Sequence, residues 1–112
     1  MAHAIKYVHT SETLRYTFDF ADDLPSTDSA LADVTGGPPT STITATDFDG
    51  TDVSATILSN KTRTGKTLIV DVGSLTEGEE YTVTFKGVGA TSSVPLVKLL
   101  EVRARSKIVG GF

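Results

Sequence analysis

Three carboxylates fall within six residues of the chain, at Asp47, Asp49 and Asp52. Calcium binds clusters of oxygen ligands of this kind, but the ligand order of an EF-hand loop and its distal glutamate are missing. Aspartate is also favoured in turns, because its carboxylate accepts hydrogen bonds from nearby backbone N–H groups. Since Asp49-Gly50 is in addition a strong hairpin signal, we expect a hairpin turn here, with weak Ca²⁺ binding as the alternative.

A second segment comes close to a phosphate-binding loop. The run Asn60-Lys-Thr-Arg-Thr-Gly65-Lys66-Thr67 would match the Walker A pattern if residue 60 were glycine. A strand-like run from Leu68 to Val72 follows, where a phosphate site needs the N-terminus of a helix. We therefore interpret this segment as a basic loop between strands. Its first three residues also form an N-glycosylation triplet, to which we attach no function without a secretory route.

The remaining acid–base groups show no catalytic arrangement. Nothing in the sequence places His3 or His9 beside the serine and carboxylate that a triad needs. Two histidines six residues apart could share a metal ion, but exposed residues of a terminal arm are the favoured interpretation. Glu77, Glu79 and Glu80 crowd one turn and are interpreted as solvated. We predict no catalytic, cofactor-binding or metal-binding residue and no enzymatic activity.

The amino-acid composition limits the kinds of fold and of partner that are expected for this chain. The chain has 112 residues, which suits one domain with its own core, and no cysteine, which excludes disulfides and thiol chemistry. The net charge of −4 combines −7 in residues 1–56 (two basic and nine acidic) with +3 in residues 57–112 (eight basic and five acidic). Because no basic stripe is present, we expect no nucleic-acid binding. The N-terminus lacks an apolar signal region and no long apolar run occurs, so we expect neither secretion nor membrane insertion.

Apolar residues recur with a period of two, which indicates half-buried β-strands. The run Leu96-Val-Lys-Leu-Leu100 interrupts this pattern and predicts a bulge or a change of partner. Asp49-Gly50 and Thr64-Gly65-Lys66 supply turns between strands. The alternating positions are Leu14, Tyr16, Phe18 and Phe20; Ile43 and Ala45; Val53, Ala55 and Ile57; Leu68, Val70 and Val72; Tyr81, Val83 and Phe85; and Leu100, Val102 and Ala104.

Three segments differ from the strands. Residues 22–42 are polar and contain Gly36-Gly37-Pro38-Pro39, so we expect a long loop, with room for one short edge strand or helical turn. Its Asp22, Asp23 and Asp28 are expected to be solvated, with metal binding as the alternative. Residues 1–11 and 106–112 are interpreted as N-terminal and C-terminal arms that either add to a sheet edge or reach a neighbouring molecule. The candidate interface residues on these arms are Ile5, Tyr7, Val8, Ile108, Val109 and Phe112.

Residues 75–85 fix the fold class. Leu75 and Tyr81 have the spacing of a tyrosine corner, in which the tyrosine hydroxyl bonds to the backbone just upstream. Short strands separated by turns then predict an all-β, two-sheet sandwich of the immunoglobulin or fibronectin III type over residues 12–105. The absence of tryptophan and of a cysteine pair excludes a true antibody-type domain.

Four stretches of the chain together resemble small immunoglobulin-like virion proteins of tailed bacteriophages. The stretches are Glu12-Thr-Leu-Arg-Tyr-Thr-Phe-Asp-Phe-Ala-Asp-Asp-Leu24, Thr42-Ile-Thr-Ala-Thr-Asp with Gly50-Thr-Asp-Val-Ser-Ala-Thr-Ile-Leu58, Gly78-Glu-Glu-Tyr-Thr-Val-Thr-Phe85 and Leu100-Glu-Val-Arg-Ala-Arg105. The resemblance implies a non-enzymatic role on the head, neck or tail, as decoration, cement or fibre component.

The leading hypothesis is a capsid decoration or cement protein, made in the host cytoplasm and located on the virion. Its expected partners are the major capsid protein or other virion proteins and further copies of itself, for instance in a trimer. A neck or tail protein, such as a fibre- or baseplate-associated domain, is the first alternative. A host-surface or carbohydrate-binding module is the second, although sugar platforms usually need more exposed aromatic residues than this chain offers.

Overall fold

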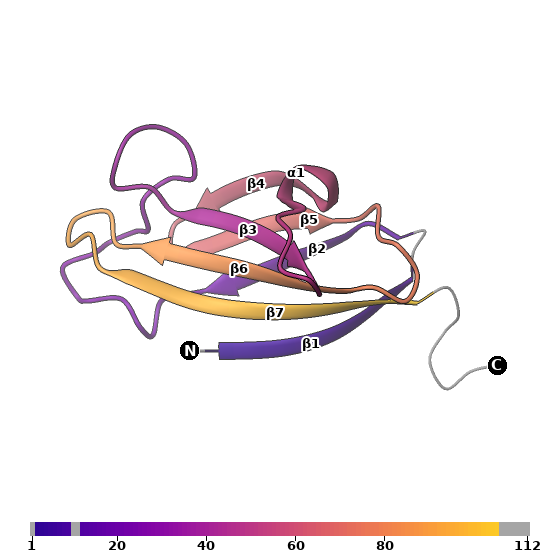
Figure 1. The fold of residues 1–112 in the computed structure, drawn as a ribbon. Helices are drawn as coiled ribbons and strands as arrows, with labels where there is room; N and C mark the ends of the chain where they lie inside the picture. Colours follow the sequence, from indigo (N-terminus) through magenta and orange to yellow (C-terminus); the bar gives the residue numbers. More distant parts are fainter. Residues whose placement is uncertain (1, 10–11, 106–112) are drawn as a thin grey trace.

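The computed structural model describes the backbone of residues 2–9 and 12–105 and the side chains of residues 12–104. The predicted all-β sandwich is confirmed (Figure 1). No helix in this described part is long and apolar enough to cross a membrane. The elements in chain order are β1 (Ala2–His9), β2 (Leu14–Asp19), β3 (Thr42–Asp47), α1 (Ser54–Ile57), β4 (Leu58–Thr64), β5 (Thr67–Val72), β6 (Glu80–Val88) and β7 (Pro95–Arg105).

Two sheets face each other. One has four strands in the order β1-β7-β6-β3, and the other has three in the order β2-β5-β4. All pairs are antiparallel except β1 with β7, which run parallel from Ala2 opposite Lys98 to His9 opposite Arg105. Residues 2–9, expected in an arm, are thus an edge strand on the sheet of their own chain (Figure 1).

The core lies between the sheets and uses the alternation that the sequence shows. Along β5, Leu68, Val70 and Val72 are fully buried, and Phe18 of β2 packs edge-on against Phe85 of β6 with ring centroids 4.8 Å apart. Such aromatic pairs add about 1 kcal/mol beyond the apolar area they bury. The buried cluster consists of Phe20, Leu31, Ile43, Ala45, Ile57, Leu58, Leu68, Val70, Val72, Leu75, Tyr81, Val83, Phe85, Leu100, Val102 and Ala104.

Residues 53–57 do not form the expected strand. They form one helical turn, in which the N–H groups of Thr56 and Ile57 donate to the carbonyl oxygen of Val53 at 2.9 and 3.1 Å. The Asp52 carboxylate accepts a hydrogen bond from the Ser54 N–H and so favours the turn. Val53 and Ile57 are four residues apart, a spacing that places both on one helix face as well as on one strand face.

The segment interpreted as a basic loop is largely strand. Residues up to Thr64 belong to β4, and Thr67 already opens β5, so that Gly65 and Lys66 alone form a two-residue turn between paired strands. Gly65 has φ of 58°, as such hairpin turns require. The pairing shifts register between Ser59 and Thr62, so the bulge lies in β4.

Of the two outcomes predicted at residues 96–100, the bulge is absent, because β7 pairs with β6 without a register shift from Pro95 to Arg103. A change of partner is present, because the described pairing of β7 with β1 begins at Lys98. The core-facing positions of this strand are Leu96, Lys98, Leu100 and Val102, with Lys98 in an apolar site. Its amine lies over the phenyl rings of Phe18 and Phe20 and donates a hydrogen bond to the Asp19 carbonyl oxygen, so this side chain is largely buried with its charge satisfied. The alternation is therefore intact.

Candidate interaction surfaces

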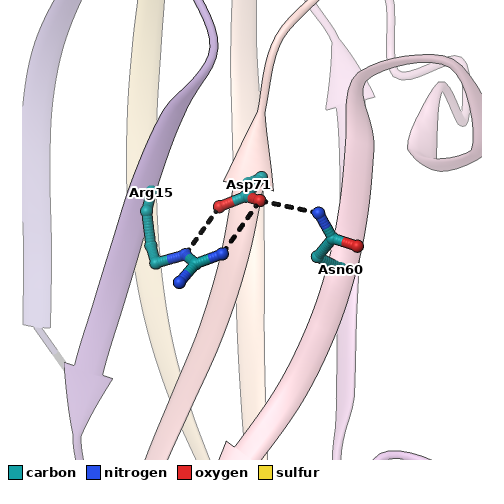
Figure 2. A network of polar contacts seen from close by, with 3 residues as sticks. All are labelled: Arg15, Asn60 and Asp71. Atoms are coloured by element: carbon teal, nitrogen blue, oxygen red, sulfur yellow. Dashed lines mark hydrogen bonds and ion pairs between the residues drawn. The ribbon is translucent and has the colours of Figure 1, made fainter.

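A polar network crosses the outer face of the three-stranded sheet (Figure 2). Asp71 on β5 accepts hydrogen bonds from Arg15 Nε at 2.9 Å and Arg15 Nη2 at 3.2 Å, and from Asn60 Nδ2 at 2.8 Å. Arg15 comes from β2 and Asn60 from β4, so one carboxylate links all three strands. Asn60 occupies the β4 bulge with φ of 53°, a left-handed conformation that asparagine tolerates better than most residues.

This network holds the three strands together and keeps the Asp71 carboxylate ionised. The hydrogen bonds from Arg15, and then from Asn60, lower the pKa of Asp71 from its ordinary value. A carboxylate of this kind stays ionised near neutral pH and cannot serve as a general acid. Arg15 and Asp71 stand opposite each other in the β2–β5 register, but the sequence analysis did not pair them.

A second carboxylate anchors the long loop. Asp28, expected to be solvated, is instead buried and accepts hydrogen bonds from the N–H groups of Thr91 and Ser92 and from the Ser92 hydroxyl at 2.8, 3.0 and 2.6 Å. The Ser92 hydroxyl is the largest cause of its lowered pKa. A side chain at Gly89 would overlap the Asp28 carboxylate. Asp28 thus joins the 20–41 loop to the β6–β7 turn.

The acidic segment at 47–52 is a turn, as expected. Asp47 Oδ1 accepts hydrogen bonds from the N–H groups of Asp49 and Thr51 at 2.9 and 3.0 Å, and Gly50 has φ of 86°. Hydrogen bonds from Ser54 lower the pKa of Asp52. These carboxylates therefore bind the backbone of their own turn. Across the described residues, no three His, Cys, Asp or Glu side chains are grouped so as to hold a metal ion.

The tyrosine corner lies next to this turn. The Thr76 N–H donates a hydrogen bond to the Tyr81 hydroxyl at 3.0 Å, which is the bond that the sequence predicted, and Leu75 is buried beside it. Tyr81 also lines a hollow of about 300 Å³ together with Asp47, Asp49 and Glu79. Of these carboxylates, Asp47 accepts hydrogen bonds from the backbone of its own turn.

The two histidines lie on β1, at positions opposite Leu99 and Arg105. Six residues of strand span about 20 Å, so one chain cannot bring His3 and His9 to the same metal ion. Of the candidate interface residues, Ile5, Tyr7 and Val8 lie on the same strand, and Ile108, Val109 and Phe112 lie outside the described residues.

The two edges of the four-stranded sheet differ. The outer edge of β3 is closed by the returning chain: the Val53 N–H donates to the Ala45 carbonyl at 2.9 Å and the Asp47 N–H to the Thr51 carbonyl at 3.0 Å. At the opposite edge, β1 is hydrogen-bonded to β7 on one side, and no other described strand lies on its outer side. Edge strands left in this way accept further strands.

The edges of the three-stranded sheet carry obstacles. β4 contains the bulge together with Lys61 and Arg63, and bulges and charged side chains both hinder pairing. On β2, the carbonyl oxygen of Asp19 accepts a hydrogen bond from Lys98. Outer edges with no further described strand and no bulge are those of β1 and β2, and β1, with eight residues against six, offers the longer one.

No family model, curated protein sequence or solved structure matches this chain.

Proposed function

We propose that the chain is a non-enzymatic structural protein of a tailed-bacteriophage virion, which binds the head shell as a decoration or cement protein. The proposal combines the resemblance carried by residues 12–105 with the way in which this sandwich can contact neighbours. The expected partners are the major capsid protein or other virion proteins.

The strand order supports the immunoglobulin-like part of the proposal. The order β2-β5-β4 corresponds to strands B, E and D of the immunoglobulin fold, and β3-β6-β7 corresponds to C, F and G. The tyrosine corner falls at the start of β6, the counterpart of strand F, where that fold has it.

The observation that carries the binding role is the asymmetry of the four-stranded sheet. Its β3 edge is closed by residues 51–54, whereas its β1 edge has no further described strand. Sheet extension by a partner strand supplies main-chain hydrogen bonds without any catalytic group. The β1 strand also bears Ile5, Tyr7 and Val8, the side chains first singled out for contact.

The test is binding to particles. Purified chain is mixed with undecorated heads and, separately, with tail preparations, and bound copies are counted after sedimentation. Saturating binding to heads supports the decoration role. Binding to tails or necks alone, at a few copies, favours the neck or tail alternative. Binding to neither contradicts a virion role and leaves the host-surface module, which a glycan array then tests.

Two adjacent proline substitutions test the β1 edge. Neighbouring residues of a strand direct their N–H groups to opposite sides, and proline has no N–H group. One of the variants Lys6→Pro and Tyr7→Pro therefore removes a donor to β7, and the other removes a donor on the outer edge of β1. The variant that keeps wild-type stability is the outer one. We expect it to lose particle binding, and full retention by that variant would exclude β1 as the contact.

A further inference from the structure

Phe48 stands out as an exposed aromatic side chain on a rigid support. It is 77% exposed, whereas Leu14, Val94 and Val97, the other exposed large apolar residues described, lie between 36% and 38%. Its turn is held by the Asp47 carboxylate, which bonds to the N–H groups of Asp49 and Thr51. A backbone held before contact loses little conformational entropy when its side chain is buried.

A hollow with a mixed polar and apolar lining lies at the start of β7. Its volume is about 320 Å³, and Pro95, Leu96, Val97, Lys98 and Asp23 line it. An apolar cavity of about 150 Å³ already accommodates benzene, so the hollow has room for a phenyl ring. It coincides with a step in the sheet, because β1 pairs with β7 from Lys98 onward and the described partner of residues 95–97 is β6 alone.

The turn and the hollow lie toward opposite ends of the four-stranded sheet. The Phe48 turn follows Asp47, which pairs with Tyr81 and through it with Val102. Val102 is seven residues along β7 from Pro95, or about 23 Å at 3.3 Å per residue. Phe48 therefore cannot reach the hollow of its own chain.

We infer that Phe48 of one copy inserts into the Pro95–Lys98 hollow of a second copy. The charges around the two surfaces favour this occupant. Asp47 and Asp49 flank Phe48, the inserting knob. The hollow has Lys98 in its wall, and the exposed Lys86 lies beside Val97 in the β6–β7 register. The Asp23 Oδ2 atom lies 3.7 Å from Lys98 Nζ, and its negative charge reduces this attraction. Burial of the Phe48 ring therefore provides most of the affinity.

The contact is heterologous: each copy uses one surface as knob and another as hollow. Contacts of this type generate rings when the rotation closes and open filaments when it does not. One aromatic side chain and one hollow make a small interface, which by itself supports weak association. The inference concerns the isolated chain and does not depend on the virion role.

Complementary variants test the contact. Phe48→Ala removes the inserting ring and leaves the hollow unchanged. Val97→Glu places a negative charge in the hollow, which repels Asp47 and Asp49 of the second copy, and leaves Phe48 unchanged. Each is ¹⁵N-labelled in turn, and amide shifts are followed as the other, unlabelled, is added to millimolar concentration. Wild-type chain alone should show concentration-dependent shifts at residues 47–50 and 96–98, and either variant alone should lose them, with affinity reduced about tenfold or more.

The mixture gives the decisive result. We expect labelled Phe48→Ala to shift at Asp23 and residues 96–98, and labelled Val97→Glu to shift at residues 47–50. No shift in either mixture, or self-association of Phe48→Ala as strong as that of wild type, would overturn the inference. Leu14→Glu, at another exposed apolar position, is the matched control and should associate like wild type. Pro95→Glu, at another exposed residue of the hollow, replaces Val97→Glu if the latter does not fold.

Discussion

Lys98 Nζ donates a hydrogen bond to the carbonyl oxygen of Asp19 at 2.7 Å and so connects β7 of one sheet to β2 of the other. The amine also lies 5.1 Å from the centre of the Phe20 ring and 5.9 Å from that of Phe18. The stem of Lys98 thus packs between the two sheets at one end of the sandwich. Its amine supplies a hydrogen bond to the Asp19 carbonyl at the edge of β2.

Replacing this amine should weaken the fold moderately. Lys98→Met keeps an apolar stem but loses the hydrogen bond and the cation–π contacts, and we expect a loss of about 1 kcal/mol in the free energy of unfolding, measured by urea denaturation. Lys98→Ala should cost more, because it also removes the stem from between the sheets. Equal stability of Lys98→Met and wild type would show that the amine contributes nothing.

Tyr81→Phe should destabilise the protein by about 1 kcal/mol, because the Thr76 N–H would lose its acceptor. The free energy of unfolding from urea titration measures the effect. Tyr16→Phe is the control: it removes the hydroxyl of a tyrosine that is only partly buried, and we expect a smaller change. A larger loss for Tyr16→Phe would contradict a special role for the corner.

Substitutions at Asn60 should separate the contribution of its backbone conformation from that of its hydrogen bond to Asp71. Asn60→Gly keeps a residue suited to the positive φ but loses the hydrogen bond to Asp71, whereas Asn60→Ala loses both advantages. We expect alanine to be less stable than glycine by about 1 kcal/mol in chemical denaturation. If the two variants were equally stable, the backbone conformation of the β4 bulge would carry no strain.

Acid should destabilise the fold through Asp28, Asp52 and Asp71. Each has a pKa lower in the folded protein than the ordinary value near 4, so each adds stability that is fully present above that value. The stability is lost as pH falls from about 4 through the lower folded pKa. Unfolding midpoints measured by urea titration between about pH 2 and 6 check this. The Asp28→Asn, Asp71→Asn double variant should show a flatter profile, and an unchanged slope would refute the assignment.

The local sequence pattern was sufficient to predict most of the strands of the sandwich. Period-two alternation located β2, β5 and β6, and the Leu75–Tyr81 spacing predicted a hydrogen bond that is present. The local errors arose where one pattern fits two structures or where a polar residue is buried. Val53 and Ile57 suit both strand and helix, and Lys98 interrupts an apolar pattern because a long cationic side chain can be buried along its stem.

The contacts that join distant segments were beyond the sequence. Asp28 was expected in solvent, and only the fold brings Ser92 to it across 64 residues. Arg15 and Asp71 are likewise 56 residues apart, and pairing them requires the register of β2 on β5. Phe48 lies within a segment that was interpreted as a turn, but its exposure depends on what packs nearby and has no local signature.

The parallel pairing of β1 with β7 also determines how the molecule would bear a mechanical load. Ala2 lies beside Lys98 and His9 beside Arg105, so the first and last described residues are at opposite ends of one strand pair (Figure 1). Tension between these two points pulls the strands past each other lengthwise. The hydrogen bonds between them then share the force and must break together, whereas a hairpin pulled from its open end separates one bond at a time.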